Sequence, residues 1–261
     1  HPRHGARKVA EMAALIETPL IETNALSRSF GGLKAVDAVD FRLEAGEIRA
    51  LIGPNGAGKT TLVGLICGRV APSSGTILFE GRDITRLPAH ARVMAGIAYT
   101  FQITSVFPKL SVYDNVALPV QRRLLAQGGV SRSALDAGVA EALDKVGLTG
   151  HAASLAGDLA YGHQRLLEIA MGLALKPRLL ILDEPTQGLS DGEIEGFIAL
   201  VREIARDATI LLIEHNMQVV MELAGRITVM NAGRILAEGA PADIRADRAV
   251  QDAYLGTVDH G

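Results

Sequence analysis

A glycine-rich loop between an apolar run and a helical pattern constrains the fold of this chain more than any other feature. The apolar run is Ile48–Ile52, and a helix is predicted from Lys59 to about Arg69. The loop and the first turn of the helix consist of Gly53, Pro54, Asn55, Gly56, Ala57, Gly58, Lys59, Thr60 and Thr61. These residues match G-x-x-x-x-G-K-[ST], the pattern of a phosphate-binding loop, and therefore predict that the chain binds a nucleotide.

The residue types in this phosphate loop suit the binding of an anion. Backbone N–H groups of the loop and the positive end of the following helix converge on an anion. Glycines permit positive φ angles and a close approach of the backbone to the ligand. Lys59 can reach the terminal phosphates, and the Thr60 hydroxyl can bind Mg²⁺. An ordinary glycine-rich turn is the alternative, but the strand before it and the helix after it favour the phosphate site.

The composition excludes several other classes of protein. The chain has 261 residues, of which 48% are hydrophobic, so it can bury the core of one large domain. A formal net charge of −3 gives no overall attraction to nucleic acid. The single cysteine, Cys67, excludes an internal disulfide framework, and no apolar run approaches the roughly 18 residues needed to span a bilayer. We expect a soluble protein in a reducing, cytoplasmic setting, without a nucleic-acid partner.

The hydrophobic patterns predict an α/β fold with a P-loop nucleotidase core. Alternating residues between about 20 and 49 predict an N-terminal antiparallel β subdomain. Unbroken apolar runs at 178–182 and 209–213 suit strands buried on both faces of a mostly parallel sheet. A helical lobe inserted at about 110–176 begins at the capping pattern Ser111–Asp114, and Ile227–Ala237 reads as a hairpin.

The domain prediction follows from these patterns. Residues 1–18 are predicted to be a terminal tail or a remnant of cloning, and residues 257–261 a C-terminal tail. Between them, residues 19–256 are predicted to form one nucleotide-binding domain that contains the helical lobe.

Polar residues follow the buried strands at the edge where open α/β sheets bind ligands. Asp183 ends one apolar run and is placed to hold magnesium, and the adjacent Glu184 could deprotonate an attacking water. His215 follows the next apolar run and could bond a γ-phosphate oxygen, although a lone histidine is more often structural. Gln102, after the strand predicted at 97–101, could position metal or water.

In its ordered set of motifs the chain resembles the ATP-binding cassette (ABC) ATPases from about residue 20 to 256. The matching elements are Phe30, the phosphate loop, Gln102, the signature Leu159–Gln164, the run Leu179–Pro185, the loop Gly188–Asp191 and His215. The resemblance implies that Phe30 stacks on adenine, Gln102 couples magnesium to the transport partner, Glu184 is the catalytic base and His215 is the switch histidine. Tyr161 and Gly162 would contact the γ-phosphate of ATP held by a second subunit, in a head-to-tail dimer.

A closer resemblance is to the ATPase subunits of branched-chain amino-acid importers. It rests on Phe101–Thr104, Leu110–Val116, Leu166–Ala170, Ile213–Met217 and the ending Gly239–Ile244 with Ala253–Gly256. The resemblance implies ATP and Mg²⁺ as cofactors and a second ATPase subunit, identical or a sister chain. It also implies two integral membrane permeases, an indirect periplasmic solute-binding partner, and a peripheral position on the inner face of the cell membrane. Related ATPases serve urea and other small polar solutes, so the solute stays open.

The signature departs from the widespread Leu-Ser-Gly-Gly-Gln. Ala160 replaces the serine that would donate a hydrogen bond to the γ-phosphate, and His163 replaces the glutamine. We expect the site to work with a weaker closed dimer, because a hydrogen bond to a charged group is worth about 1.5–3 kcal/mol.

Two alternatives to the importer fit the sequence less well. The soluble ABC ATPases that act on DNA carry long coiled-coil insertions, for which this sequence has no room, and those that act on ribosomes usually join two cassettes, of which this sequence contains one. A small P-loop kinase would have no use for the signature, Gln102 and His215 together.

Overall fold

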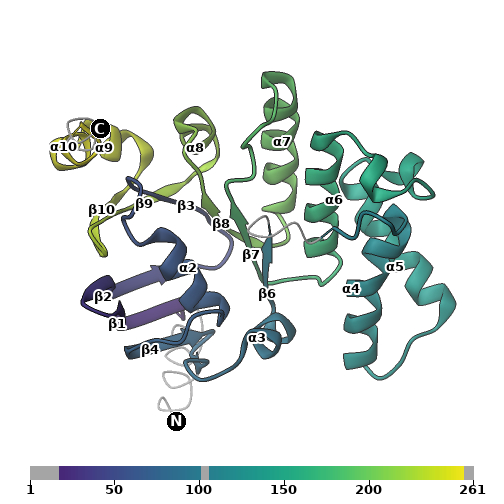
Figure 1. Ribbon diagram of the computed structural model, residues 1–261, viewed down its shortest axis with the longest axis horizontal. Helices are drawn as coiled ribbons and strands as arrows, with labels where there is room; N and C mark the ends of the chain where they lie inside the picture. The colour runs from purple at the N-terminus through teal and green to yellow at the C-terminus, as the bar shows by residue number, and fades with distance from the viewer. Residues whose placement is uncertain (1–17, 101–105, 256–261) are drawn as a thin grey trace, which may run out of the picture.

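The two apolar runs predicted as buried strands lie at the centre of a six-stranded sheet (Figure 1). The computed structural model describes residues 18–100 and 106–255. The strand order is β10-β9-β3-β8-β7-β6. The strands are β3 (Ile48–Ile52), β6 (Ile97–Thr100), β7 (Leu179–Asp183), β8 (Thr209–Ile213), β9 (Arg226–Asn231) and β10 (Arg234–Gly239). All neighbours are parallel except β9 and β10, which form the predicted hairpin.

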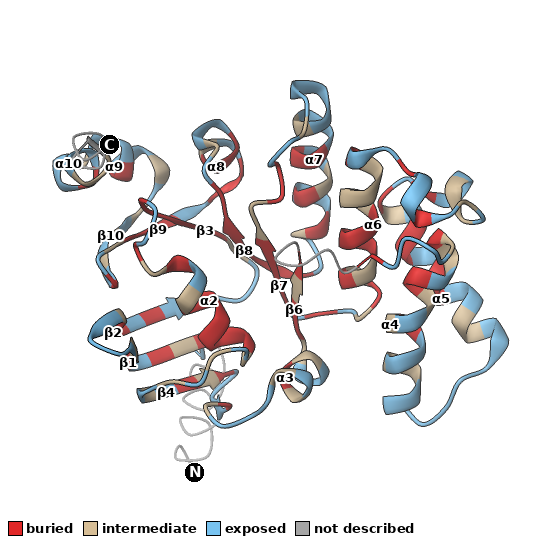
Figure 2. Cartoon of the chain, viewed as in Figure 1, coloured by how far each residue is buried: buried red, intermediate tan, exposed pale blue. Residues whose placement is uncertain are grey.

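The central strands are apolar throughout because both faces of the sheet are covered. On β7, Leu179 and Ile181 pack on one face with α2 (Lys59–Cys67), and Leu180 and Leu182 pack on the other. The second face is covered by α6 (Tyr161–Leu173), α7 (Asp191–Ile204) and α8 (Met217–Leu223). Figure 2 shows β3, β7 and β8 as almost entirely buried. A strand with two buried faces loses the alternation of apolar and polar residues.

A four-stranded antiparallel sheet lies beside the core, as predicted. Its order is β2-β1-β4-β5, with β1 (Ile21–Phe30), β2 (Leu33–Leu43), β4 (Ser74–Phe79) and β5 (Arg82–Asp83). The sequence pattern predicts a first strand of only Ile21–Thr23, whereas β1 extends to Phe30. Register shifts follow Thr23, and Ala25 has a φ of +44°, so the alternation that predicts a strand is interrupted there. Phe30, which the sequence pattern places on a loop between two strands, is consequently the last residue of β1.

The inserted helices follow β6 and precede β7 (Figure 1). They are α4 (Val112–Ala126), α5 (Arg132–Lys145) and α6, with the short turns η1 (Thr149–His151) and η2 (Ala156–Asp158). The predicted cap is confirmed, because the Ser111 side chain accepts a hydrogen bond from the Asp114 amide. The spacing of apolar residues predicts a helix from Gln164 to about Leu175, but α6 starts at Tyr161. Ala160 supplies no side-chain cap and Gly162 lies in the first turn, so the sequence carries no start signal.

Four helices of the described residues were not predicted: α3 (Ala89–Ala95), α8, α9 (Pro241–Ala246) and α10 (Arg248–Leu255). The last two pack behind β9, where Ile244 and Val250 join Ile52 and Val229 in a small apolar cluster. Across 18–100 and 106–255, none of the helices combines the length and apolar character needed to cross a membrane. The limits of the domain stay predictions.

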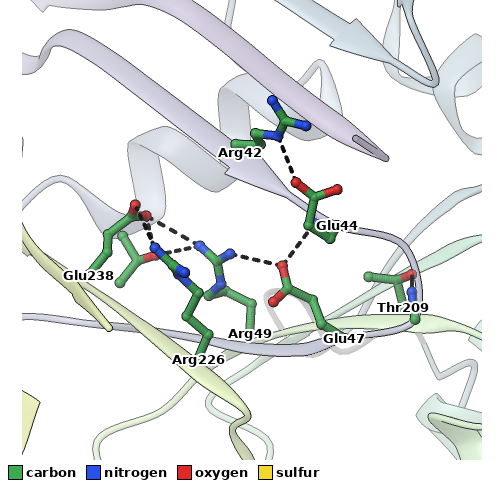
Figure 3. A network of polar contacts seen from close by, with 9 residues as sticks. Arg42, Glu44, Glu47, Arg49, Thr209, Arg226 and Glu238 are labelled. Atoms are coloured by element: carbon green, nitrogen blue, oxygen red, sulfur yellow. Dashed lines mark hydrogen bonds and ion pairs between the residues drawn. The ribbon is translucent and has the colours of Figure 1, made fainter. Parts of the chain in front are cut away.

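A buried polar network ties the antiparallel sheet to the core sheet at the end of β3 away from the phosphate loop. The Arg49 side chain, 3% exposed, forms ion pairs with Glu47 at 2.8 Å and Glu238 at 3.2 Å. Its guanidinium also donates to Thr228 and lies 5.5 Å from the ring centroid of Phe41 on β2. Figure 3 shows this network with its neighbours Arg42, Glu44, Thr209 and Arg226.

Candidate functional site

The strand register brings the predicted site residues to one edge of the core sheet. Ile213 on β8 lies opposite Leu51 on β3 and opposite Asp183 on β7. The three parallel strands therefore end level with one another. The phosphate loop, Glu184 and His215 follow these ends, at the carboxyl edge where α/β sheets bind ligands.

The phosphate loop has the backbone conformation that its glycines permit. A Cβ on Gly53 would lie 2.2 Å from the Met230 carbonyl oxygen, and one on Gly58 would lie 2.4 Å from that of Ala35. Gly58 also has a φ of +103°, in the left-handed region. The Gly233 amide donates to the Ala57 carbonyl at 2.9 Å, so the β9–β10 hairpin supports the loop. No side chain caps helix α2, whose N-terminus follows the loop.

Lys59 is folded back along the loop. Its ammonium donates to the backbone carbonyls of Gly53 at 2.5 Å and Pro54 at 3.1 Å, and the residue is only 7% exposed. Burial lowers the pKa of Lys59, and the nearby carboxylates of Glu184 and Asp183 oppose that shift. A partly desolvated cation in this position suits an anionic ligand.

A cavity of about 440 Å³ lies over the loop. The predicted residues that line it are Phe30, Asn55, Gly56, Ala57, Gly58, Lys59, Thr60, Thr61, Glu184 and His215. Gly53, Pro54 and Asp183 do not line it. The Phe30 ring is 46% exposed at the end of β1, and the Arg28 guanidinium lies 4.6 Å from its centroid. The structure thus joins residues that are more than 150 positions apart in the sequence.

Glu184 and His215 contact each other at this edge. His215 Nε2 lies 2.7 Å from Glu184 Oε1, and both side chains are partly exposed. Glu184 has a φ of +49°, a left-handed conformation that costs a non-glycine residue of this kind about 1–3 kcal/mol. Its amide donates to the Ile213 carbonyl at 2.7 Å, which anchors the strained residue to β8. The pair is positioned by backbone geometry, not by side-chain packing alone.

Two residues that the sequence reasoning missed support this edge. Tyr99 on β6 donates a hydrogen bond to Asp183 Oδ2. Burial raises the pKa of Asp183, and the hydrogen bond from Tyr99 opposes the shift. Glu214, which is 4% exposed, accepts from the Thr186 hydroxyl at 2.6 Å and from the His215 amide at 2.9 Å. Glu214 could have been predicted, because it follows an apolar run in the way that Asp183 ends one. No sequence pattern marks Tyr99 as part of the site.

The signature residues lie apart from this cavity. Among the described residues, the lining of the cavity includes neither Tyr161 nor Gly162. Tyr161 is half exposed at the start of α6, and its hydroxyl donates to the Gln187 carbonyl at 3.0 Å. A Cβ on Gly162 would lie 2.1 Å from Glu193 Oε1. Gln102 lies outside the described residues.

Comparison with known families assigns this chain to a protein family. The family model of the ABC transporter matches residues 36–187, more than half of the chain. The chain is an ABC transporter ATPase. A second model, for the branched-chain amino acid ATP-binding cassette transporter, matches residues 234–260.

Curated relatives and solved structures agree with this family. The chain is 38% identical to BraF of Pseudomonas aeruginosa, a high-affinity branched-chain amino acid transport ATP-binding protein, over 91% of this chain and 98% of BraF. It is 40% identical to LivG of Escherichia coli, of the same description, with the same coverage. Among solved structures, the ATP-binding cassette MJ1267 of an ABC transporter has a TM-score of 0.81 and 27% identity, covering 90% of this chain and 98% of that one. The structure of cbiO1 from Clostridium perfringens, part of the transporter complex cbiONQ, has a TM-score of 0.79 and 26% identity, covering 94% of this chain and 98% of that one.

In this ABC ATPase four of the sequence motifs lie together, and their roles stay predictions. The phosphate loop, Glu184, His215 and Phe30 share one cavity. The predicted fold class is confirmed, with a mixed core sheet, an antiparallel sheet and inserted helices.

Proposed function

We propose that this ABC ATPase hydrolyses ATP to power an importer of branched-chain amino acids. The observation that carries the ATPase activity is the convergence of Lys59, Glu184 and His215 on one cavity over the phosphate loop. The solute class is supported by BraF and LivG, and by the branched-chain family model at residues 234–260.

The proposal gives a role to the phosphate loop and to three side chains beyond it in the cavity. Loop amides and Lys59 bind the β- and γ-phosphates, and the exposed ring of Phe30 stacks on the adenine. Glu184 takes a proton from the attacking water while the water oxygen forms a bond to the γ-phosphorus. The bond between the γ-phosphorus and the bridging oxygen of ADP breaks at the same time. His215, held by Glu184 at 2.7 Å, hydrogen-bonds a γ-phosphate oxygen. The products are ADP and phosphate.

The oxygen donors at the site fit a magnesium ion. Mg²⁺ is held in nucleotide sites by one or two protein oxygens together with phosphates and waters. Thr60 and Asp183 would supply a hydroxyl and a carboxylate, with Gln102 as a further candidate. Bound there, Mg²⁺ would offset the negative charge of the phosphates.

The proposal requires partners. Tyr161 and Gly162 lie away from the cavity of their own chain, which suits contact with the γ-phosphate held by a second ATPase subunit, in a head-to-tail dimer of identical or sister chains. Two membrane permeases would carry the solute, delivered by a periplasmic binding protein. The ATPase would then lie on the inner face of the membrane.

The first test is steady-state hydrolysis by the purified chain in Mg²⁺ and ATP. Glu184→Gln should retain ATP binding and lose at least about 100-fold in turnover, since the attacking water loses its base. The exposed Glu195 on α7 gives the matched control, because Glu195→Gln makes the same chemical change outside the cavity.

Lys59→Ala distinguishes binding from chemistry in the same assay. It should lose ATP binding itself, as measured by equilibrium titration, because the loop loses its cation.

Near-normal turnover of Glu184→Gln would remove Glu184 from the role of base.

A further inference from the structure

The side chain of Tyr99 reaches the carboxylate of Asp183 across neighbouring strands. Tyr99 on β6 lies opposite Ile181 on β7 in the strand register. Residues two apart on a strand share a face, so Asp183 points to the same face as Ile181. Tyr99 Oη donates to Asp183 Oδ2 at 2.5 Å. Tyr99 and Ile181 belong to the apolar cluster that α2 covers, so this hydrogen bond lies on the phosphate-loop side of the sheet.

The Tyr99 ring is fixed on a second side by an arginine. The guanidinium carbon of Arg69 lies 4.5 Å from the ring centroid. Arg69 follows Gly68, the C-cap residue of α2. A cation over an aromatic face is attractive, and it restrains the ring without using its hydroxyl. The contacts therefore run from the end of α2 through Tyr99 to the end of β7.

Tyr99 is the donor of this hydrogen bond, because an ionised carboxylate can only accept one. A charged acceptor beside a neutral donor gives a strong hydrogen bond.

We propose that Tyr99 is a positioning residue for magnesium: its hydroxyl holds Asp183 Oδ2, which leaves the other carboxylate oxygen for the metal or its bound water. Groups that orient a metal ligand in this way typically change metal affinity or activity by about 10–100-fold when they are lost. The inference rests on the proposed function, because it needs Asp183 to serve the metal of bound Mg·ATP.

Tyr99→Phe tests the role because it removes only the hydroxyl and keeps the ring against Arg69. ATP affinity is measured by calorimetry, once with excess Mg²⁺ and once with EDTA. We expect the ratio of the two affinities to fall about tenfold in Tyr99→Phe, with binding in EDTA unchanged. The Mg²⁺ concentration for half-maximal hydrolysis should rise by a similar factor.

Tyr113→Phe is the matched control. The Tyr113 hydroxyl donates to Asp136 Oδ1, also at 2.5 Å, but on the helical lobe at α4 and α5. Loss of that hydrogen bond should leave the Mg²⁺ dependence unchanged. In an Asp183→Asn background, Tyr99→Phe should have no further effect on the affinity ratio, because the group that it positions is already altered.

The outcomes separate this inference from the proposed function. If Tyr99→Phe lowers the melting temperature but keeps the wild-type affinity ratio, the hydroxyl only stabilises the fold and the inference is wrong. A further tenfold loss from Tyr99→Phe in the Asp183→Asn background would also contradict it. If the wild-type chain hydrolyses ATP but binds it equally with and without Mg²⁺, this inference is wrong and the proposed function stands. If the wild-type chain does not hydrolyse ATP in Mg²⁺, the proposed function itself fails.

Discussion

At the residue scale, Glu184 shows how backbone geometry prepares a chemical group. Its φ of +49° is left-handed, its backbone is hydrogen-bonded to Ile213 and Gln187, and its carboxylate lies 2.7 Å from His215 Nε2. Conformational strain of this kind persists only where the surrounding structure enforces it. Here it turns the side chain that follows a buried strand toward the phosphate loop.

Cys67 gives a prediction at the same scale. Burial raises the pKa of the Cys67 thiol to about 12. Since the thiolate is the reactive form, native Cys67 at pH 8 should carry about a thousandfold less thiolate than an ordinary thiol, and it should resist iodoacetamide. Alkylation followed by mass spectrometry has one possible site, because the chain has one cysteine. Equal alkylation rates in buffer and in denaturing urea would contradict this account.

At the element scale, the Arg49 network joins β3 to β9, β10 and the neighbouring β2 (Figure 3). Breaking a buried ion pair by removing one partner leaves an uncompensated charge. Arg49→Ala should lower the free energy of unfolding by about 3 kcal/mol, near the low end for buried pairs, because Glu47 and Glu238 keep some access to water.

Urea denaturation measures this loss, and Arg132→Ala supplies its control. Arg132 pairs with Asp136 on α5, but its side chain is 81% exposed. An exposed pair at this spacing is worth only about 0.3–0.5 kcal/mol. Equal losses in the two variants would mean that burial of the Arg49 network contributes nothing to stability.

The sequence alone predicts some elements of this fold and not others. Local patterns predicted the phosphate loop, β7, β8 and the β9–β10 hairpin, because each depends on adjacent residues. The length of β1 was missed, since the irregular backbone at Ala25 interrupts the alternation. Helix α6 was placed late because Ala160 supplies no cap. The contact between Tyr99 and Asp183 spans 84 positions and depends on strand register, which no local pattern specifies.

At the scale of the whole molecule, the cavity and the signature belong to different parts of one chain. The cavity lies over α2, whereas Tyr161 and Gly162 begin α6 on the inserted lobe (Figure 1). Under the proposed function, each chain therefore supplies the cavity of one composite site and the signature of the other.

Ala160→Ser tests that arrangement. A serine at this position would add a donor to the γ-phosphate of the partner's ATP and should favour the closed dimer by up to about 1.5–3 kcal/mol. We expect the ATP concentration for half-maximal hydrolysis to fall, or turnover to change, relative to the wild type. Unchanged values of both kinetic parameters would show that Ala160 is not at a nucleotide contact.

The central claim is that ATP hydrolysis by this chain drives amino-acid import. Its most direct test is uptake of radiolabelled leucine into proteoliposomes that contain the permeases and binding protein, with ATP supplied on the side of the ATPase. We predict uptake that depends on ATP with the wild-type chain and falls to background with Glu184→Gln. Equal uptake with both chains, or none with an ATP-hydrolysing wild-type complex, would contradict the account.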